Sequence, residues 1–252
     1  MGTSVSLSQA LALQNELMAL ANPGKAVGMA RFFKTGKGQY GEGDRFLGIG
    51  VPAQRKIALR YIGLSLKDVG RVLKSPYHEH RFTALEILVA QYERGTTAVR
   101  DAVFAFYLGQ TSRINNWDLV DTSAPYIVGE HVAQSSREAL HKLAVSKDLW
   151  ERRIAIVATL ALIKGGDVEE TFRIGEKLLS DKHDLIHKAV GWMLRETGKV
   201  SREKLLQFLH SHHAQLPRTA LRYAIERFTP EERARLMKGE RLADKSRKPG
   251  LR

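Results

Sequence analysis

The segment from Leu149 to Ile163 reads LWERRIAIVATLALI, and it decides the fold. Its apolar residues recur at intervals of three and four, which places them on one face of an α-helix. Its longest apolar run, Ile154–Ile163, is about half of the roughly 20 residues that cross a bilayer and is interrupted by Thr159. The chain has almost no stretches that alternate apolar and polar residues between hairpin turns, the pattern that predicts strands. The segment therefore predicts a helix in an all-α protein.

The same spacing recurs in six further segments, which predict further helices. They are Ser6–Ala21, Ala53–Ile62, Arg81–Tyr92, Trp117–Val128, Leu185–Leu194 and Arg218–Phe228. Residues that favour helix starts precede helical patterns at Ser6, Ser65, Ser135, Asp167, Ser201 and Thr229. Glycines expected to end helices are Gly63, Gly165, Gly166, Gly198 and Gly239.

The helical segments repeat along the chain. When Arg81, Trp117, Arg153 and Lys188 are set in register, the spacings are 36, 36 and 35 residues. A period in this range with two helices per unit is typical of a curved α-solenoid, whose inner helices line a concave surface. A helical bundle in which these spacings arise by chance is the alternative.

The composition bounds the function. The chain has 252 residues with 40 Lys and Arg, 27 Asp and Glu, a formal net charge of +13, and no cysteine. The lack of cysteine excludes disulfide scaffolds, thiol nucleophiles and cysteine-ligated metal sites. The positive charge favours a polyanionic partner, with nucleic acid first and an anionic membrane surface second. A protein that is simply basic is the alternative.

We predict a single HEAT-like helical-repeat domain at residues 1–237, which includes a glycine-rich loop at 34–44, followed by a basic tail. The Lys34–Asp44 segment contains a GxGxxG match, but no strand precedes it, so we expect a flexible loop and not a dinucleotide site. The tail at residues 238–252 holds six basic and two acidic residues and is predicted to be disordered. No export signal or membrane span is evident, so we expect a cytoplasmic protein.

The repeat register gathers chemistry on one predicted wall. Trp117 and Asp121 are four residues apart and share a helix face, as do Lys188 and Trp192, and Arg153 occupies the matching position. Each has an ordinary alternative, since indoles pack in cores, acids favour helix starts and cations are solvated. Together they supply one carboxylate that can stabilise a positive charge and two indoles whose flat faces can contact sugars or stack on bases. They also supply cations that can bind phosphates.

These residues carry a family resemblance. The strings W-D-L-V-D at 117–121 and K-A-V-G-W-M-L-R-E at 188–196 resemble bacterial DNA alkylation repair proteins of the AlkD type, which are DNA glycosylases built from HEAT-like repeats. Further matches are N-P-G-K-A at 22–26, F-L-G-I at 46–49, and Trp150 with Arg153. The resemblance covers residues from about 22 to about 228.

The resemblance implies a monofunctional glycosylase that hydrolyses the N-glycosidic bond of cationic N3- and N7-alkylated purines in duplex DNA. Asp121 would stabilise the oxocarbenium-like sugar and position water, and Trp117 and Trp192 would flank the lesion. Arg153 would hold the backbone or orient Asp121. The expected DNA-binding residues are Arg31, Arg81, Lys188, Arg195, Arg218 and Arg222. No metal or other cofactor is implied, and we expect a monomer that binds double-stranded DNA.

Some features depart from the family pattern. Phe32 stands where an aromatic hydroxyl is common, Gly50 follows the F-L-G-I string in place of a polar residue, and Asn116 replaces a second aromatic residue. His183 and His187 are four residues apart, but no third metal ligand accompanies them. A non-catalytic α-solenoid that binds nucleic acid or an acidic protein remains the alternative function.

Overall fold

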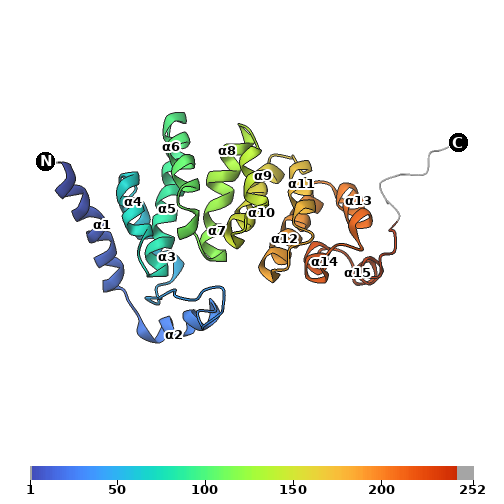
Figure 1. The fold of residues 1–252 in the computed structure, drawn as a ribbon, viewed down its shortest axis with the longest axis horizontal. Coiled ribbons are helices and arrows are strands. Elements are labelled where there is room, and N and C mark those ends of the chain that lie inside the picture. The colour runs from blue at the N-terminus through green and yellow to red at the C-terminus, as the bar shows by residue number, and fades with distance from the viewer. Residues whose placement is uncertain (1, 243–252) are drawn as a thin grey trace. The chain divides into compact units, whose positions relative to one another are not determined.

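A computed structural model describes residues 2–242 of the chain, with side chains from residue 9 onwards. These residues are helical, apart from the connecting turns and an isolated backbone bridge between Arg45 and Tyr77. The all-α prediction is confirmed (Figure 1). None of the described helices is long and apolar enough to span a membrane.

The chain divides into two compact units at residues 134 and 135. The first unit holds α1 (Gly2–Ala19), α2 (Pro23–Phe32), α3 (Val51–Arg60), α4 (Leu66–Leu73), α5 (His78–Arg94), α6 (Thr97–Leu108), the 3-10 helix η1 (Thr111–Arg113), α7 (Trp117–Ala124), the π-helical turn η2 (Pro125–Gly129) and α8 (Glu130–Ala133). The second holds α9 (Glu138–Ala144), α10 (Leu149–Lys164), α11 (Glu169–Lys177), α12 (Asp184–Val200), α13 (Arg202–His212), α14 (Arg218–Ala224) and α15 (Pro230–Met237).

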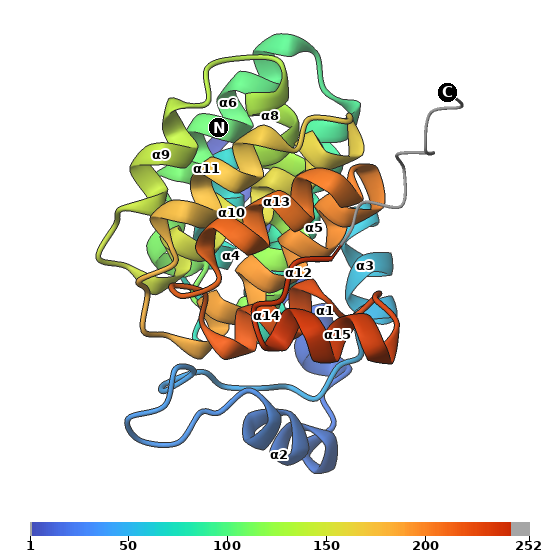
Figure 2. The same ribbon diagram turned by 90° about the vertical axis from the view of Figure 1, so that its right-hand side faces the viewer.

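In the first unit α5 is the central helix. It packs against α3, α4, α6 and α7, and its side chains Leu85 and Leu88 are fully buried. The short helix α2 and the loop after it lie across one end of these packed helices (Figures 1 and 2). This loop is the segment predicted to stand apart from the repeats, and it carries residues that complete the candidate site described below.

In the second unit α10, α12 and α14 pack in succession, and α9, α11 and α13 pack against them. Ile154 of α10 and Ile186 of α12 are fully buried between these helices. Consecutive helix pairs that stack in two layers agree with the predicted α-solenoid. The predicted concave face and the single repeat domain over residues 1–237 stay predictions.

The observed helix starts refine the repeat register. Asp121, Arg153, Lys188 and Arg222 are each the fifth residue of their helices, α7, α10, α12 and α14. Trp117 is the first residue of α7, one turn earlier. The spacing of about 36 residues therefore places Trp117 at the start of its helix, whereas Arg153 and Lys188 lie one turn further along theirs.

The helix predicted at Trp117–Val128 changes geometry at Pro125. The α-helical part ends at Ala124, a π-helical turn covers Pro125–Gly129, and α8 continues from Glu130. Proline has no backbone N–H and cannot complete the α-helical hydrogen-bond pattern, so a wider turn at this point has a local cause.

Most of the predicted helix-start residues cap helices. The side chains of Ser65, Ser201 and Thr229 accept a hydrogen bond from the first turn, and Thr229 forms a reciprocal capping box with Glu232. Asp167 accepts from the backbone N–H of Glu169 at 3.1 Å. Two expectations were wrong. Ser6 lies inside α1, which begins at Gly2, and α9 begins at Glu138 with Arg137, not Ser135, at its cap.

The prediction that Gly198 ends a helix was also wrong, because α12 continues to Val200. A Cβ on Gly198 would lie 2.6 Å from a methyl carbon of Leu205 in α13. Gly191 allows a still closer approach, since a Cβ there would lie 2.5 Å from the carbonyl oxygen of Ala220 in α14. These glycines permit close packing of α12 against its neighbours. Gly165 and Gly239, by contrast, follow the ends of α10 and α15 as predicted.

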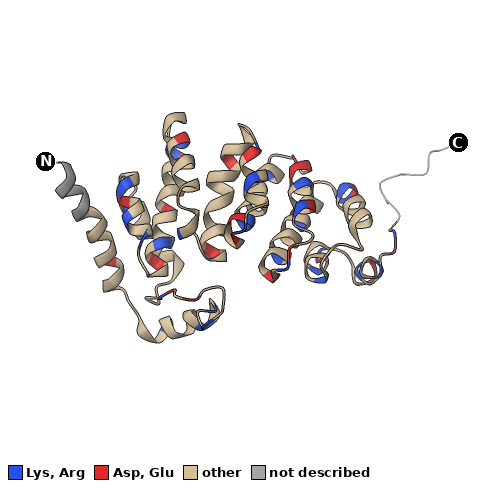
Figure 3. Ribbon diagram, in the orientation of Figure 1, with Lys and Arg blue, Asp and Glu red and all other residues tan. Residues whose placement is uncertain are grey.

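Charged residues are spread unevenly along the chain (Figure 3). Every helix of the second unit carries Lys or Arg, and all of them except α14 also carry acidic residues. The predicted basic tail begins at Lys238, directly after α15, and its residues 243–252 lie outside the described part of the chain.

Candidate functional site

The N-terminal half of α7 carries the Trp117–Asp121 pair. Asn116 caps this helix, and its side-chain oxygen accepts a hydrogen bond from the backbone N–H of Trp117 at 2.9 Å. Both Trp117 and Asp121 are partly exposed, while Leu119 and Val120 are fully buried against the rest of the unit. The helix therefore holds a carboxylate and an indole one turn apart on its accessible side.

Asp121 lies close enough to Tyr107 for its charge to act on the phenol. Burial raises the pKa of Tyr107, the hydrogen bond with Ser123 opposes this rise, and the negative charge of Asp121 adds to it. The Tyr107 hydroxyl is hydrogen-bonded to Ser123 Oγ at 2.9 Å. Tyr107 therefore stays neutral beneath Asp121 across the physiological pH range.

An aromatic cluster supports the Trp117 indole. Phe33, at the end of α2, stacks on it with ring centroids 5.3 Å apart, and Phe32 meets it edge-on at 5.9 Å. Phe32 is 63% exposed, an unusual exposure for a phenyl ring in contact with other aromatic rings. Phe32, the residue that replaces an aromatic hydroxyl, thus extends the apolar surface of Trp117 towards solvent.

A buried charged network lies directly behind this cluster. His78, the first residue of α5, contacts Asp44 through Nδ1 at 3.0 Å and Asp118 through Nε2 at 2.7 Å. Asp44 also pairs with Arg81, and Asn116 Nδ2 donates to Asp44 at 3.3 Å. We name Asp44, His78, Arg81 and Asp118 the buried network. Sequence reasoning missed His78, because its partners are 34 and 40 residues away along the chain.

The buried network changes the interpretation of Arg81. Its side chain was predicted to bind DNA, but it is 4% exposed, pairs with Asp44 and donates to the carbonyl oxygen of Ser75 at 3.1 Å. A guanidinium in these surroundings holds the loop against α5 and is not presented to a phosphate. Asp44, expected in a flexible loop, is a partner in that contact.

The second unit holds the remaining predicted catalytic residues. Arg153 of α10 is 5% exposed, and its guanidinium donates to the carbonyl oxygen of Leu185, at the start of α12, at 2.6 Å. Lys188 and Trp192 lie one turn apart on α12, both partly exposed, with Lys188 Nζ 2.7 Å from Asp184. Arg153 is thus tied to the helix that carries Lys188 and Trp192.

The other predicted DNA-binding cations differ in exposure. Arg31, Arg218 and Arg222 are exposed, and Arg218 donates to the carbonyl oxygen of Met237 at 2.8 Å. Arg195 is partly exposed and pairs with Glu196 and Glu226. Carboxylates therefore already partly neutralise Arg195, whereas Arg31 and Arg222 present their charge to solvent.

The two histidines considered as metal ligands have local roles. His183 caps α12, its Nδ1 accepting from the backbone N–H of Leu185 at 3.2 Å. His187 Nε2 lies 2.5 Å from the carbonyl oxygen of Asp181. Within residues 2–242 no group of three or more His, Asp or Glu side chains is arranged to hold a metal ion.

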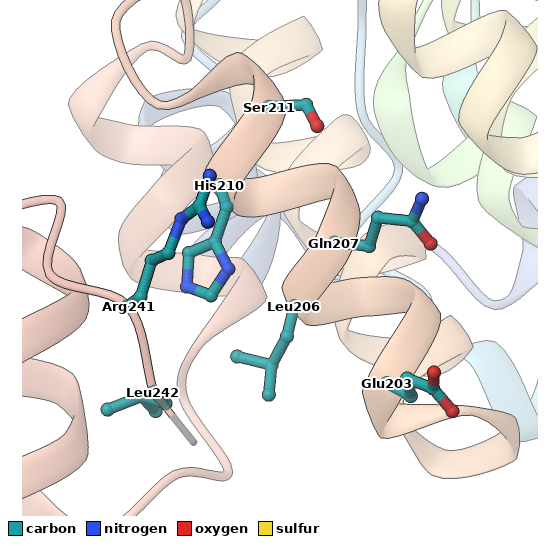
Figure 4. Close-up of a pocket in the computed structure, with 7 residues that line it drawn as sticks. All are labelled: Glu203, Leu206, Gln207, His210, Ser211, Arg241 and Leu242. Atoms are coloured by element: carbon teal, nitrogen blue, oxygen red, sulfur yellow. The ribbon is translucent and has the colours of Figure 1, made fainter. Parts of the chain in front are cut away.

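A pocket in the second unit has none of the predicted site residues in its lining (Figure 4). It is formed by α13 and the segment after α15, where His210 and Arg241 lie side by side. Its lining consists of Glu203, Leu206, Gln207, His210, Ser211, Arg241 and Leu242. It has neither an acid–indole pair nor an aromatic cluster like those on α7.

The stacked helix pairs place the chain among the α-solenoid proteins. A comparison with known protein families identifies the family of the chain. The family model described as DNA alkylation repair enzyme matches residues 13–228, so the chain belongs to that family. A role in the repair of alkylated DNA follows from this membership.

A solved structure has the same fold. It is described as a predicted DNA alkylation repair enzyme from Enterococcus faecalis, with a TM-score of 0.64 and 18% sequence identity. The similarity covers 83% of this chain and 97% of that one. No curated protein matches the chain.

Proposed function

We propose that this protein is a monofunctional DNA glycosylase that releases cationic N3- and N7-alkylated purines from duplex DNA. The observation that carries the proposal is the Trp117–Asp121 pair on α7, with the exposed Phe32 beside it. Membership in the alkylation repair family makes damaged DNA the substrate class. The formal net charge of +13 supports a polyanionic substrate.

The chemistry needs few groups. An alkylated purine that already carries a positive charge leaves without protonation, so no general acid is required. As the C1′–N bond breaks, positive charge develops on the sugar, and the ionised Asp121 carboxylate would stabilise it. A water molecule oriented by the same carboxylate would add to C1′, giving an abasic sugar, the free base and a proton.

The remaining residues have supporting roles in this proposal. The indole faces of Trp117 and Trp192 would contact the deoxyribose and the neighbouring bases. Arg153 would hold the DNA backbone or orient the Asp121 carboxylate. The DNA phosphates would be bound by Arg31, Lys188, Arg195, Arg218 and Arg222. The chemistry assigned to these residues uses no metal or organic cofactor.

The decisive experiment compares Asp121→Asn with wild type on methylated duplex DNA, with released N7-methylguanine measured by chromatography. We expect at least a hundredfold slower release with DNA affinity nearly unchanged, because the substitution removes charge stabilisation and little volume. Asp101→Asn is the matched control, since Asp101 is an exposed acid of α6 in the same unit. It should release base at the wild-type rate.

Two results would contradict the proposal. Wild-type release in Asp121→Asn would remove the assigned role of Asp121. No release by wild type from any alkylated duplex, combined with tight DNA binding, would favour a non-catalytic solenoid that recognises nucleic acid.

A further inference from the structure

His78 is the most unusual polar side chain of the first unit. It is 2% exposed, yet both ring nitrogens contact carboxylates, Asp44 on one side and Asp118 on the other. A neutral imidazole has one N–H donor and could serve only one carboxylate, whereas an imidazolium has two. The geometry therefore favours the protonated ring.

The charges of the buried network balance only with that protonation state. The network contains two carboxylates, Asp44 and Asp118, and the guanidinium of Arg81. A protonated His78 supplies the second positive charge. A neutral His78 would leave one carboxylate uncompensated in a largely buried place, which is costly.

His78 also contacts the aromatic cluster. Its ring stacks on Phe46 with centroids 4.6 Å apart and lies 5.0 Å from Phe33. Phe33 in turn stacks on Trp117, and Asp118 is the residue next to Trp117 on α7. Two separate routes, one polar and one aromatic, thus connect the imidazole to the same indole.

We propose that His78, as an imidazolium held between Asp44 and Asp118, is a positioning residue that fixes the Trp117 indole and the loop beside it. The inference rests on the proposed function only in taking Trp117 as a DNA contact. Loss of the proton would break one of the two carboxylate contacts and loosen the first turn of α7 from the loop. Asp121, the acid proposed to act in the chemistry, is not one of the four residues of this network.

The charged groups around His78 agree with this assignment. Burial lowers its pKa, but Asp118 and then Asp44 outweigh burial and raise the pKa to about 9. On α5 itself, Arg81 is the opposing cation, and the carboxylate of Glu79 is occupied by the backbone N–H groups of Leu47, Gly48 and Ile49. The face supplied by α2 is the uncharged ring of Phe33.

The test follows two signals by NMR as pH rises from 6 to 10.5 in the full chain. One is the His78 imidazole carbon-bound proton, identified by its loss in His78→Gln. The other is the Trp117 indole N–H, identified by its loss in Trp117→Phe. We expect both to titrate together with a midpoint near pH 9.

A conservative variant sharpens the result. Asp118→Asn keeps an oxygen that can accept from Nε2 but removes the charge, so both midpoints should fall by about one pH unit or more. Asp101→Asn is again the matched control and should leave both midpoints unchanged. Base release by Asp118→Asn should begin to fall at the same lower pH, after subtraction of release without enzyme.

Two outcomes overturn the inference. One is a wild-type imidazole midpoint below pH 7. The other is an indole signal that does not follow the imidazole. Both are read without substrate, so the absence of glycosylase activity would defeat the proposed function and leave this inference standing. If Asp118→Asn does not fold, the wild-type titration alone decides.

Discussion

At the scale of single residues, burial separates arginines that look alike in the sequence. Arg81 and Arg153 are 4% and 5% exposed, and both donate to backbone carbonyl oxygens of their own unit. Arg31 and Arg222 are exposed. Removal of a buried guanidinium that is paired within the fold leaves its partners uncompensated. Arg31 and Arg222 therefore present their charge to solvent, whereas Arg81 does not.

The raised pKa of His78 makes stability depend on pH. A histidine whose pKa is higher in the folded state stabilises the fold below its unfolded pKa of 6.5, and this contribution disappears as pH rises through about 9. We expect the free energy of unfolding to fall by about 3 kcal/mol across this interval. Chemical denaturation at a series of pH values would measure it.

The same measurement has an internal control. The pKa values of His80, His131, His183 and His210 are lowered, mainly by burial, so their effects on stability lie near and below pH 6.5. The part of the slope between pH 7 and 9 that is lost in His78→Gln therefore reports His78. A flat profile there in wild type, or the same slope in His78→Gln, would contradict the prediction.

At the scale of elements, the sequence predicts helices better than their contacts. Apolar spacing, which local residues determine, predicts helices at Leu149–Ile163 and Leu185–Leu194, and the structure has them at Leu149–Lys164 and Asp184–Val200. Gly198 was misread as a stop because a glycine ends a helix in many contexts, and close packing against Leu205 is invisible from local sequence. The π-helical turn at Pro125 was likewise not predicted.

Close packing of α12 on α14 leads to a stability prediction. Gly191→Ala would push a Cβ into the backbone of Ala220, so we expect a loss of about 2 kcal/mol. Gly28→Ala is the matched control, because a Cβ there meets nothing within 4 Å and alanine favours the helix α2. Urea denaturation should show the first variant destabilised and the second unchanged or slightly stabilised. Equal midpoints for the two variants would show that α12 and α14 do not pack this closely.

At the scale of the whole molecule, the charge of +13 predicts salt-sensitive DNA binding. Each phosphate contact releases counterions, so the logarithm of the affinity for duplex DNA should fall linearly with the logarithm of salt concentration. Arg222→Gln should weaken binding for all sequences and reduce the slope by about one. Arg94→Gln, an exposed arginine at the end of α5 outside the predicted set, is the control. Fluorescence anisotropy with a labelled duplex measures the affinity and its salt dependence for each variant. A salt dependence near zero for wild type would contradict a phosphate-binding surface.

The sequence by itself determined the helical class, most of the caps, the repeat spacing and the family. The helices and caps depend on residues within one or two turns of each other, the repeat spacing on similar helical patterns about 36 residues apart, and the family on short strings of consecutive residues. It also singled out Trp117 and Asp121, because one turn of helix fixes their common face.

Only the tertiary structure decided the surroundings of those residues. His78 meets Asp44 and Asp118 across 34 and 40 residues of chain, and Phe33 reaches Trp117 from α2. The same folding removed Arg81 from the surface and made the loop at 34–44 part of the site. The physical reason is that the charge and the accessibility of a side chain depend on the groups that surround it in the fold. These groups come from distant parts of the sequence, so the local spacing of apolar residues does not reveal them.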